Sequence, residues 1–217
     1  GLLITYIDEK GFLRFTPLGG VPIAGLAGQR GGFGNGRTGT ISLEKLERPG
    51  DFKLQKLYID IGAASREEAE EVVRIGEGAV FVGGFEELGS RIMAKALADR
   101  VGCFVAMEAC KRTKSTHQLE FVFTVQEEIG NRGAKTAAYA LKPDLAIAVD
   151  VTSAGDTPQA AGMSVSLGGG VGIKVFDRSL MTPPQVKQWM AAIAAQGRIP
   201  FQWEVAEQGG TDSGAIQ

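Results

Sequence analysis

The sequence predicts an α/β protein in two parts, a small β-rich part over residues 1–90 and an α/β part over residues 91–217. Short apolar segments separated by turn residues fill the first part, a pattern typical of a small β domain. The second part contains a strand, helix, strand pattern between residues 119 and 151. With 217 residues and 44% hydrophobic content, the chain is long enough to bury a core in one large domain or in two small ones.

The predicted strands of the β-rich part are four short apolar runs, at residues 2–7, 13–15, 57–61 and 79–82. Turn-forming runs such as Asp-Glu-Lys-Gly and Pro-Leu-Gly-Gly separate them. One helix is predicted over residues 66–74, because Ser65 is a favourable N-cap and Glu68 completes a capping box. Gly76 stands where this helix is expected to end.

The α/β part begins with a predicted helix over residues 100–111. An apolar strand over residues 119–125, an alanine-rich helix over 133–141 and a second apolar strand over 144–151 follow. Pro143 ends the helix, because the residue before a proline is disfavoured in the helical conformation. Two strands joined through a helix in this way are expected to be parallel neighbours in one sheet.

Two more elements are predicted near the end of the chain. Pro183 and Pro184 open a helix that Gly197 ends, because proline is favoured in the first turn and glycine just past the last. An apolar run at residues 201–205 is the last predicted strand.

Two adjacent carboxylates, Glu127 and Glu128, follow the first strand of the βαβ unit, and Asp150 lies near the end of the second. The carboxyl ends of parallel strands meet at one edge of a sheet, where open α/β sheets place their sites. A turning backbone can aim both adjacent acids at one cavity, so that one binds a metal while the other moves a proton. Three converging acids suggest a cation such as zinc, cobalt or manganese. The alternative is a pair of solvated acids in a loop.

Two glycine-rich segments carry weaker signals. Residues 34–39 match the pattern GxGxxG formally, but strand-like residues follow instead of a helix, so a surface β-turn is favoured over a phosphate site. Residues 168–172 also precede a strand-like segment and not a helix.

Composition favours a cytoplasmic protein. A net charge of −2 predicts no attraction to nucleic acid or to membranes, and no apolar run has the length of a membrane span. Cys103 and Cys110 would lie about 10 Å apart along one helix, too far for a disulfide within it. They are expected to be free thiols of the core in a reducing compartment.

The sequence around the acids resembles the tetrahedral (TET) metallo-aminopeptidases, which include glutamyl and deblocking aminopeptidases, some of them labelled cellulase M or endoglucanase M. The resemblance rests on Val-Gln-Glu-Glu-Ile-Gly at residues 125–130, Arg-Gly-Ala at 132–134, Asp-Val-Thr at 150–152 and Gly-Thr-Asp at 210–212. It extends along nearly the whole chain, because residues 58–63 and 65–70 fit the family's inserted domain.

The resemblance implies a phosphorylase/hydrolase-like mixed sheet with flanking helices, plus an inserted small β-rich domain, a PDZ-like barrel. Residues 1–90 would be this inserted dimerisation domain, and residues 91–217 part of the α/β metallopeptidase catalytic domain. Relatives hydrolyse N-terminal residues from peptides and assemble dimers into hollow particles of twelve subunits. The expected partners are therefore peptide substrates and further copies of the chain.

The resemblance also assigns roles to the acids. Glu127 would be the general base that takes a proton from the attacking water, while Glu128 and Asp150 would be ligands of two divalent metal ions, zinc or cobalt. Gly169, Gly170 and Asp212 would lie near the substrate cleft. Each of these three has a structural alternative, since the glycines can form a turn and Asp212 can cap local backbone amides.

This chain departs from the family pattern at three metal ligands. Alanine at position 98 stands where the family has the bridging aspartate, and the segments that carry the family's two histidine ligands have no counterpart in the 217 residues, as expected of a chain truncated at both ends. His117 lies in a polar connection and is interpreted as an exposed loop residue. Asp99 is a possible substitute or supporting ligand. The sequence therefore predicts zero or one tightly bound metal ion.

Three functions remain open on this basis. The first is a dinuclear-metal aminopeptidase whose activity is impaired in this chain. The second is a catalytically dead homologue or fragment that acts only through assembly. A glycoside hydrolase rests on the endoglucanase label alone, and adjacent Glu127 and Glu128 are poorly arranged to face each other across a sugar.

Overall fold

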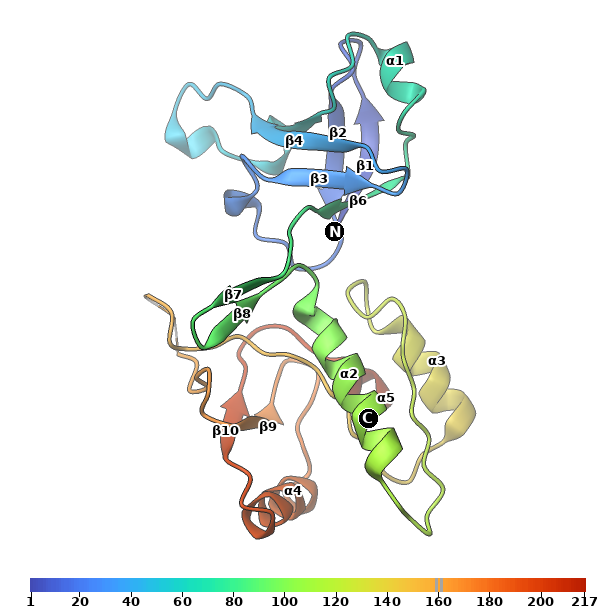
Figure 1. The fold of residues 1–217 in the computed structure, drawn as a ribbon, viewed down its shortest axis with the longest axis vertical. Helices are drawn as coiled ribbons and strands as arrows, with labels where there is room; N and C mark the ends of the chain where they lie inside the picture. The colour runs from blue at the N-terminus through green and yellow to red at the C-terminus, as the bar shows by residue number, and fades with distance from the viewer. Residues whose placement is uncertain (159, 161) are drawn as a thin grey trace. The chain divides into compact units, whose positions relative to one another are not determined.

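The structure, a computed structural model, describes residues 1–158, 160 and 162–217. The chain divides into two compact units, Gly1–Lys95 and Ala96–Gln217, and each unit is described by itself. The elements of both units are labelled in Figure 1.

Six strands of the first unit close into a barrel in the order β1-β2-β5-β4-β3-β6, with antiparallel neighbours throughout. The strands are β1 (Leu2–Ile7), β2 (Leu13–Pro17), β3 (Arg30–Phe33), β4 (Thr38–Leu43), β5 (Leu57–Asp60) and β6 (Gly78–Phe81). Four of them confirm the strands predicted from apolar runs. Closing the sheet leaves these six strands without an open edge.

The barrel encloses one apolar core. On β1 the buried side chains are Leu2, Ile4 and Ile7, and the pairing with β2 shifts register between Ile4 and Tyr6. Side chains alternate between the two faces of a strand, so without this bulge Ile7 would point outward. The shift keeps the third apolar residue inside. Further buried residues come from the other elements, among them Leu13, Phe15, Phe33, Ile41, Leu57, Ile59 and Ala79.

Short helices and a hairpin complete the first unit. They are the 3-10 helices η1 (Ile23–Gly25), η2 (Pro49–Asp51) and η3 (Leu54–Lys56), the helix α1 (Arg66–Glu70), and the hairpin strands β7 (Glu86–Leu88) and β8 (Arg91–Met93). The Ser65 hydroxyl accepts from the N–H of Glu68 at 3.3 Å, as predicted for an N-cap. The Glu68 carboxylate accepts from the N–H of Ala64 instead of that of Ser65.

Residues 34–37 of the glycine-rich segment form the predicted turn between β3 and β4, and residues 38–39 already belong to β4. Gly36 has φ of +83°, a conformation that side chains with a Cβ disfavour. The carboxamide of Asn35 accepts from the N–H of Arg37 and donates to the carbonyl of Val72. These bonds fix the turn to the segment that follows α1.

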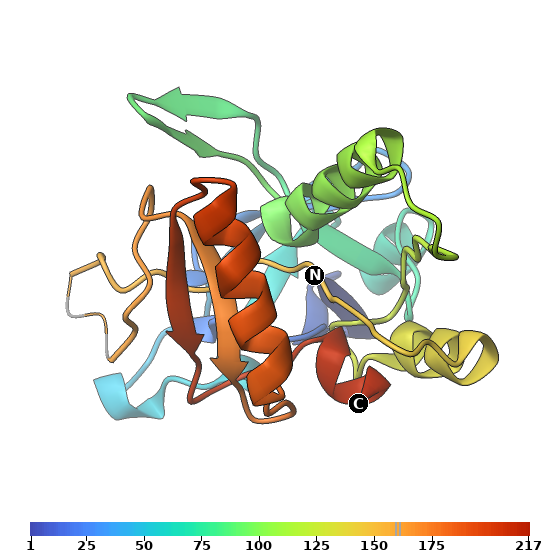
Figure 2. The same cartoon turned by 90° about the horizontal axis from the view of Figure 1, so that it is seen from below.

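The second unit contains the helices α2 (Leu97–Arg112), α3 (Arg132–Leu141), α4 (Pro184–Gln196) and α5 (Asp212–Ile216), with strands β9 (Val171–Phe176) and β10 (Phe201–Val205). β9 and β10 are parallel, with Ile173 opposite Trp203, and α4 connects them. Figure 2 shows α4 lying along this strand pair, and Ala194 of α4 and Ile173 of β9 are both buried. The βαβ unit of the described chain is therefore β9–α4–β10.

The predicted strands at residues 119–125 and 144–151 are wrong for this structure. Both segments are drawn as plain coil in Figure 1, and neither is assigned as a strand. A strand forms only when a neighbour pairs with its backbone, and no backbone bond joins residues 119–124 or 144–150 to another main chain in the described residues. In the second unit, the only sheet formed by described residues is the pair β10-β9, so the larger mixed sheet is not formed.

The two cysteines correct a second expectation. Both are free, as predicted, but both are exposed on α2 and neither belongs to a core. Val101, Phe104 and Val105 on the same helix are also exposed, so α2 has no apolar layer packed over it in the described structure.

A buried charge cluster joins β9 and β10. The Lys174 ammonium lies 2.6 Å from Glu204 Oε1 and 3.5 Å from Asp177 Oδ2. Asp177 Oδ1 accepts from the Ser179 hydroxyl and from the N–H groups of Ser179 and Leu180. Burial alone would raise the pKa of Asp177, but these bonds and the charge of Lys174 outweigh it and lower the pKa.

We expect Asp177→Asn to lower the free energy of unfolding by about 3 kcal/mol at pH 7, the scale for breaking a buried charged pair. A depressed pKa contributes stability above the unfolded-state value of about 3.9, and this contribution is lost as the pH falls through the folded-state value. The difference in free energy of unfolding between the parent and Asp177→Asn should therefore disappear in acid. Urea unfolding at pH 7 and below pH 4 measures it, and a gap that widens in acid would contradict the expectation.

Candidate active site

Five carboxylates of the second unit gather around one place. Asp99 lies in the first turn of α2, Glu127 and Glu128 precede α3, and Asp150 and Asp212 come from the segment before β9 and the start of α5. The charges of Asp150 and Asp212 raise the pKa of both Asp99 and Glu127. Hydrogen bonds supply the geometric link, because Asn131 donates to both Glu127 and Asp212.

Glu127 is half-buried, and burial is the main reason that its pKa is raised. The neighbouring charges of Asp150, Glu128 and Asp212 raise the pKa further, while a hydrogen bond from Asn131 lowers it. A carboxylate whose pKa is shifted toward the working pH exchanges protons more readily, as a general base requires.

Burial and the charges of neighbouring carboxylates also raise the pKa values of Asp150 and Asp99. Burial raises the pKa of Asp150 first, and Asp212 and Glu128 add to the effect. The N–H of Val151 and the charge of Lys174 act in the opposite direction. Burial also dominates at Asp99, where Oδ1 accepts from the N–H of Gly102 at 3.1 Å. One oxygen of Asp99 is thus engaged in capping α2.

Asn131 and Thr124 were not singled out from the sequence, yet they connect the acids. The Asn131 amide lies 3.2 Å from Glu127 Oε1 and 3.1 Å from Asp212 Oδ1, and donates to both. The hydroxyl of Thr124 donates to Asp212 Oδ2 at 2.6 Å. Asp212 therefore accepts from side chains instead of capping backbone amides. The only hint in the sequence was an asparagine just before a helix, a residue type common at N-caps.

We expect Asn131→Gly to lower the free energy of unfolding by about 1–2 kcal/mol, because two hydrogen bonds to carboxylates are lost. Asn131 has φ of +53°, so Asn131→Ala should cost about 1 kcal/mol more than the glycine variant. In the parent chain, the hydrogen bond from Asn131 lowers the pKa of Glu127. Removing this donor therefore raises the pKa of Glu127 further. The deficit should therefore grow as the pH rises through the pKa of Glu127. Urea titrations from pH 5 to 8 test this, and a deficit independent of pH would contradict it.

Polar contacts link the segment that carries Asp150 to the strand pair, through Thr152, Glu204 and Lys174. Thr152 donates to Glu204 Oε1 at 2.7 Å, and the same oxygen pairs with Lys174. Lys174 and Glu204 are register partners on the parallel strands β9 and β10. Thr152, two residues after Asp150, thereby attaches this segment to the strand pair β9–β10. These residues were also missed, because pairing across two strands is not visible in one sequence.

The donor chemistry of the cluster suits a divalent cation, because carboxylates that repel one another gain most from a positive charge between them. The arrangement is nonetheless incomplete. Among the residues that the structure describes, no three histidine, cysteine, aspartate or glutamate side chains are close enough to hold a metal ion. The expectation that Glu127, Glu128 and Asp150 lie at one sheet edge within metal-bridging reach is therefore not met by the described residues, because the two segments that carry these acids form no strands there.

Gly169 and Gly170 belong to a structural turn. Gly170 has φ of +103°, and a Cβ at this position would collide with the carbonyl of Pro200. The Gln202 side chain donates to the carbonyls of Ser166 and Gly170 and so holds the turn against β10. A groove of about 740 Å³ in this unit is lined by Asp150, Lys174 and Glu204 but by neither glycine. His117 is an exposed loop residue, as predicted.

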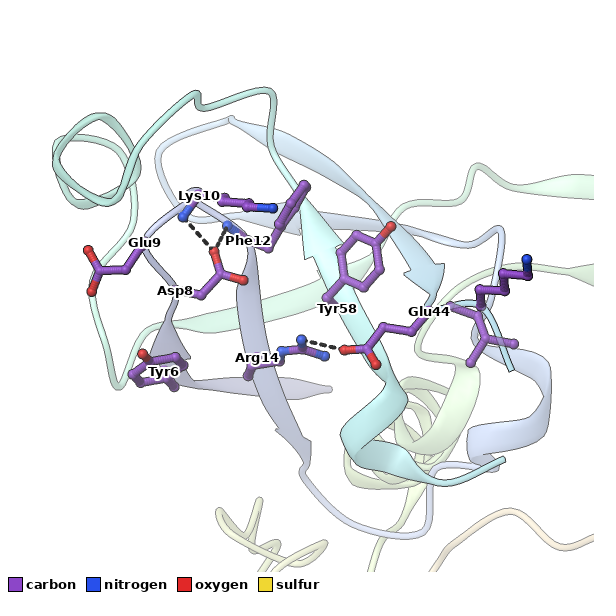
Figure 3. Close-up of a pocket in the computed structure, with 10 residues that line it drawn as sticks. Tyr6, Asp8, Glu9, Lys10, Phe12, Arg14, Glu44 and Tyr58 are labelled. Atoms are coloured by element: carbon purple, nitrogen blue, oxygen red, sulfur yellow. Dashed lines mark hydrogen bonds and ion pairs between the residues drawn. The ribbon is translucent and has the colours of Figure 1, made fainter. Parts of the chain in front are cut away.

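A second hollow, of about 530 Å³, lies on the barrel, and its three carboxylates, Asp8, Glu9 and Glu44, all have partners within that unit (Figure 3). Arg14 pairs with Glu44 at 2.6 Å and lies over the ring of Tyr58. Asp8 accepts from the N–H groups of Lys10 and Phe12. The charged groups here serve the barrel itself, so the acids of the second unit remain the candidate site.

The sequence profile of the M42 glutamyl aminopeptidases matches residues 1–217, the whole chain. The chain belongs to this family. A curated relative from Acetivibrio thermocellus, provisionally named an aminopeptidase, is 51% identical over 218 residues, which cover all of this chain and 66% of the relative. The M42 chain described here thus spans just under two thirds of that relative.

Solved structures of aminopeptidases share the fold. An aminopeptidase from the archaeon Desulfurococcus kamchatkensis is 40% identical, with a TM-score of 0.90, over all of this chain and 64% of its own. The TET1 peptidase of Pyrococcus horikoshii, described as assembling into a tetrahedron or a large octahedral shell, is 36% identical with a TM-score of 0.83. The match covers 99% of this chain and 68% of that one. The mixed α/β fold of the M42 chain is therefore that of TET aminopeptidases.

In the part of the M42 chain that the structure describes, no helix combines the length and the apolar character needed to cross a bilayer.

Proposed function

We propose that the chain is the larger part of an M42 metallo-aminopeptidase that hydrolyses N-terminal residues from peptides in the cytoplasm. The observation that carries the proposal is that a chain which matches the family along its whole length links Glu127 to Asp212 through hydrogen bonds from Asn131, with the charges of Asp150 and Glu128 also acting on Glu127. A hydrolytic site needs a proton acceptor and groups that hold a metal ion, and these carboxylates offer candidates for both.

In this proposal Glu128 and Asp150 would hold divalent metal ions, zinc or cobalt, and Asp99 would support them. When bound, such ions polarise a carbonyl group and lower the pKa of water. Glu127 takes the proton from the attacking water and delivers it to the leaving amine. Asn131 holds Glu127 Oε1 in place through a hydrogen bond of 3.2 Å, and Asp212 holds Asn131. Burial raises the pKa of Glu127, which favours uptake of a proton at this carboxylate.

Activity of the chain as it stands is expected to be negligible. Ala98 offers no carboxylate at the bridging position, and the described residues contain no group of three metal ligands. This favours a second candidate, a catalytically dead member that acts through assembly. Metal analysis of the purified chain after gel filtration separates the two. At least one tightly bound zinc or cobalt ion per chain supports the peptidase proposal, whereas none even in excess metal supports the assembly role.

We further propose that the barrel is the inserted, PDZ-like domain through which two copies of the chain associate, on the way to larger particles. Val80 on β6 and Leu88, Ile92 and Met93 of the β7–β8 hairpin are half-exposed or more. Apolar side chains gathered on a small domain mark a candidate contact surface.

We expect a dimer or a larger oligomer in sedimentation experiments at micromolar concentration. Ile92→Asp should shift the equilibrium toward monomer at least tenfold, because a charge would be buried in the contact. Ile75→Asp is the matched control, since Ile75 is 60% exposed on the same unit but lies outside the hairpin. A strictly monomeric parent chain would contradict this expectation.

A further inference from the structure

A polar loop follows strand β9 and is organised by one buried acid. In this loop, residues 177–181, Asp177 is only 1% exposed. Its Oδ1 accepts from the Ser179 hydroxyl at 2.8 Å and from the N–H groups of Ser179 and Leu180 at 2.7 and 2.9 Å. Lys174 pairs with the other carboxylate oxygen, at 3.5 Å. Asp177 therefore fixes both the backbone and the side chain of Ser179.

Hydrogen bonds at both ends of the loop attach it to the segment that carries Asp212. At its start, the carbonyl of Phe176, the last residue of β9, accepts from the N–H of Ala206 at 2.9 Å. At its end, the carbonyl of Met181 accepts from the carboxamide of Gln217 at 3.3 Å. Asp212 lies between these two points of attachment.

Ser179 lies directly against two glycines of the same segment. A Cβ at Gly210 would come within 2.7 Å of Ser179 Oγ, and a Cβ at Gly214 would collide with both Oγ and Cβ of Ser179. Neither glycine has a positive φ, so what matters at both positions is the missing side chain and not the freedom of the backbone. The loop therefore sets how closely α5 can approach, because a close-packed contact of this kind cannot absorb an added methyl group without movement.

The helix placed by this contact carries Asp212 in its first turn and packs beside α3 (Figure 2). Asp212 Oδ2 accepts from Thr124 at 2.6 Å, and Oδ1 accepts from Asn131 at 3.1 Å. The same Asn131 amide donates to Glu127 Oε1 at 3.2 Å. Both bonds of Asn131 are already at the long end of the usual range of about 2.7–3.2 Å. A small displacement of α5 is therefore enough to break the bond from Asn131 to Asp212 and to release the amide that holds Glu127.

We propose that the loop at residues 177–181 positions Glu127 through α5. Ser179, which Asp177 holds in place, determines the position of α5, and the two hydrogen bonds of Asn131 transmit that position to the carboxylate. The loop residues touch none of the reacting groups, so they are positioning residues and not catalytic ones. Their effect on proton transfer rests on the proposed function, whereas the contacts from Ser179 to Asn131 do not.

The test uses the side-chain amide of Asn131 in the ¹⁵N-labelled 217-residue chain. Its two N–H signals are identified by their absence from the spectrum of Asn131→Gly. In Gly214→Ala, these protons should exchange with water at least about tenfold faster, because hydrogen bonds to carboxylates are lost. Unchanged signals in a folded Gly214→Ala chain would overturn the proposal.

Two controls separate positioning from a general loss of stability. In Gly214→Ala, the backbone amides of α4 should keep the exchange rates of the parent, because α4 lies outside the contacts from Ser179 to Asn131. If they accelerate together with the Asn131 signals, the loop only stabilises the unit and the proposal is wrong. Gly197→Ala is the matched glycine variant: its Cβ would meet the flexible side chain of Ile199 at 3.2 Å. This variant should leave the Asn131 signals unchanged.

A compensating pair of substitutions tests the packing itself. Because Ser179 is exposed, Ser179→Gly should not prevent folding, and it vacates the space that the methyl group of Gly214→Ala needs. The carbonyl of Ser179, 2.7 Å from the same position, remains. The double variant should therefore return the exchange of the Asn131 amide to within about threefold of the parent rate. A double variant that exchanges as fast as Gly214→Ala contradicts the proposal.

These measurements require no turnover, so they also separate this inference from the proposed function. If the exchange rates follow the expected pattern while no metal-loaded form of the chain hydrolyses peptides, the proposed function fails and the contacts from Ser179 to Asn131 stand. If peptidase activity is found but Gly214→Ala leaves the Asn131 signals unchanged, the proposed function stands and the positioning role is refuted.

Discussion

Ala98→Asp should raise aminopeptidase activity by at least roughly a hundredfold in a chain that also carries the flanking segments of an M42 relative, the upper scale for restoring a supporting metal interaction. A carboxylate between two cations offsets their mutual repulsion, and alanine cannot do so. The same substitution should raise the metal stoichiometry toward two ions per chain. Hydrolysis of leucine and glutamate anilides and metal analysis after gel filtration measure the two effects.

Stability gives Ala98→Asp a readout that does not depend on turnover. In the absence of metal, the new carboxylate adds a charge beside Asp99, where burial and the charges of Asp150 and Asp212 already raise the pKa. The variant should therefore be less stable than its parent without metal and gain more from added zinc. If the extended chain with Ala98 unchanged already binds two ions and turns over equally fast, Asp99 or water serves as the bridge. The assignment of the defect to Ala98 would then be wrong.

Local sequence signals predicted the barrel well. The strand at residues 2–7 and the N-cap at Ser65 were both predicted correctly. These features depend on short-range alternation and on side chains that bond to nearby backbone. The barrel also encloses its own core, so the apolar pattern of each strand is satisfied within the unit. Propensity and tertiary structure agree there, which is the condition under which sequence patterns predict reliably.

The same reasoning failed for residues 119–125 and 144–151 because a strand is a property of a pair. Their apolar pattern describes a buried environment, and the described residues provide neither partner backbones nor a covering layer. The βαβ unit was consequently placed around α3, whereas the structure forms it around α4. The apolar pattern alone cannot indicate whether the βαβ unit forms around α3 or around α4, because it does not show which strands have pairing partners.

Sequence reasoning singled out acids for the candidate site but could not identify their connections. The sequence singled out Glu127, Glu128 and Asp150 because a carboxylate beside a buried apolar run must be paired or bound to a metal ion. It did not single out Asn131 and Lys174, because their role comes from contacts across the fold: Asn131 reaches α5, and Lys174 reaches Glu204 on β10. Such contacts between residues far apart in sequence leave no local signal.

The active background for the second test is an extended chain that carries Ala98→Asp. In it, Glu127→Gln should lower the turnover rate at least a hundredfold, because general base catalysis contributes factors of about 10² to 10⁴. The amide keeps the size of the side chain but cannot take a proton. Metal content should remain that of the parent, since Glu127 is assigned no ligand role. Glu128→Gln is the matched comparison, which should lose both activity and bound metal.

A second measurement tests Glu127 in the 217-residue chain without any turnover. Its raised pKa means that the folded state binds its proton more tightly than the unfolded state does, so the ionised carboxylate disfavours folding. This penalty is absent below the unfolded-state pKa of about 4.3 and develops as the pH rises through the folded-state value. Glu127→Gln should therefore gain stability relative to the parent over that interval, and the gain should persist to pH 8. A variant that loses stability as the pH rises would show that Glu127 is held by a cation-like partner and is not a free proton acceptor.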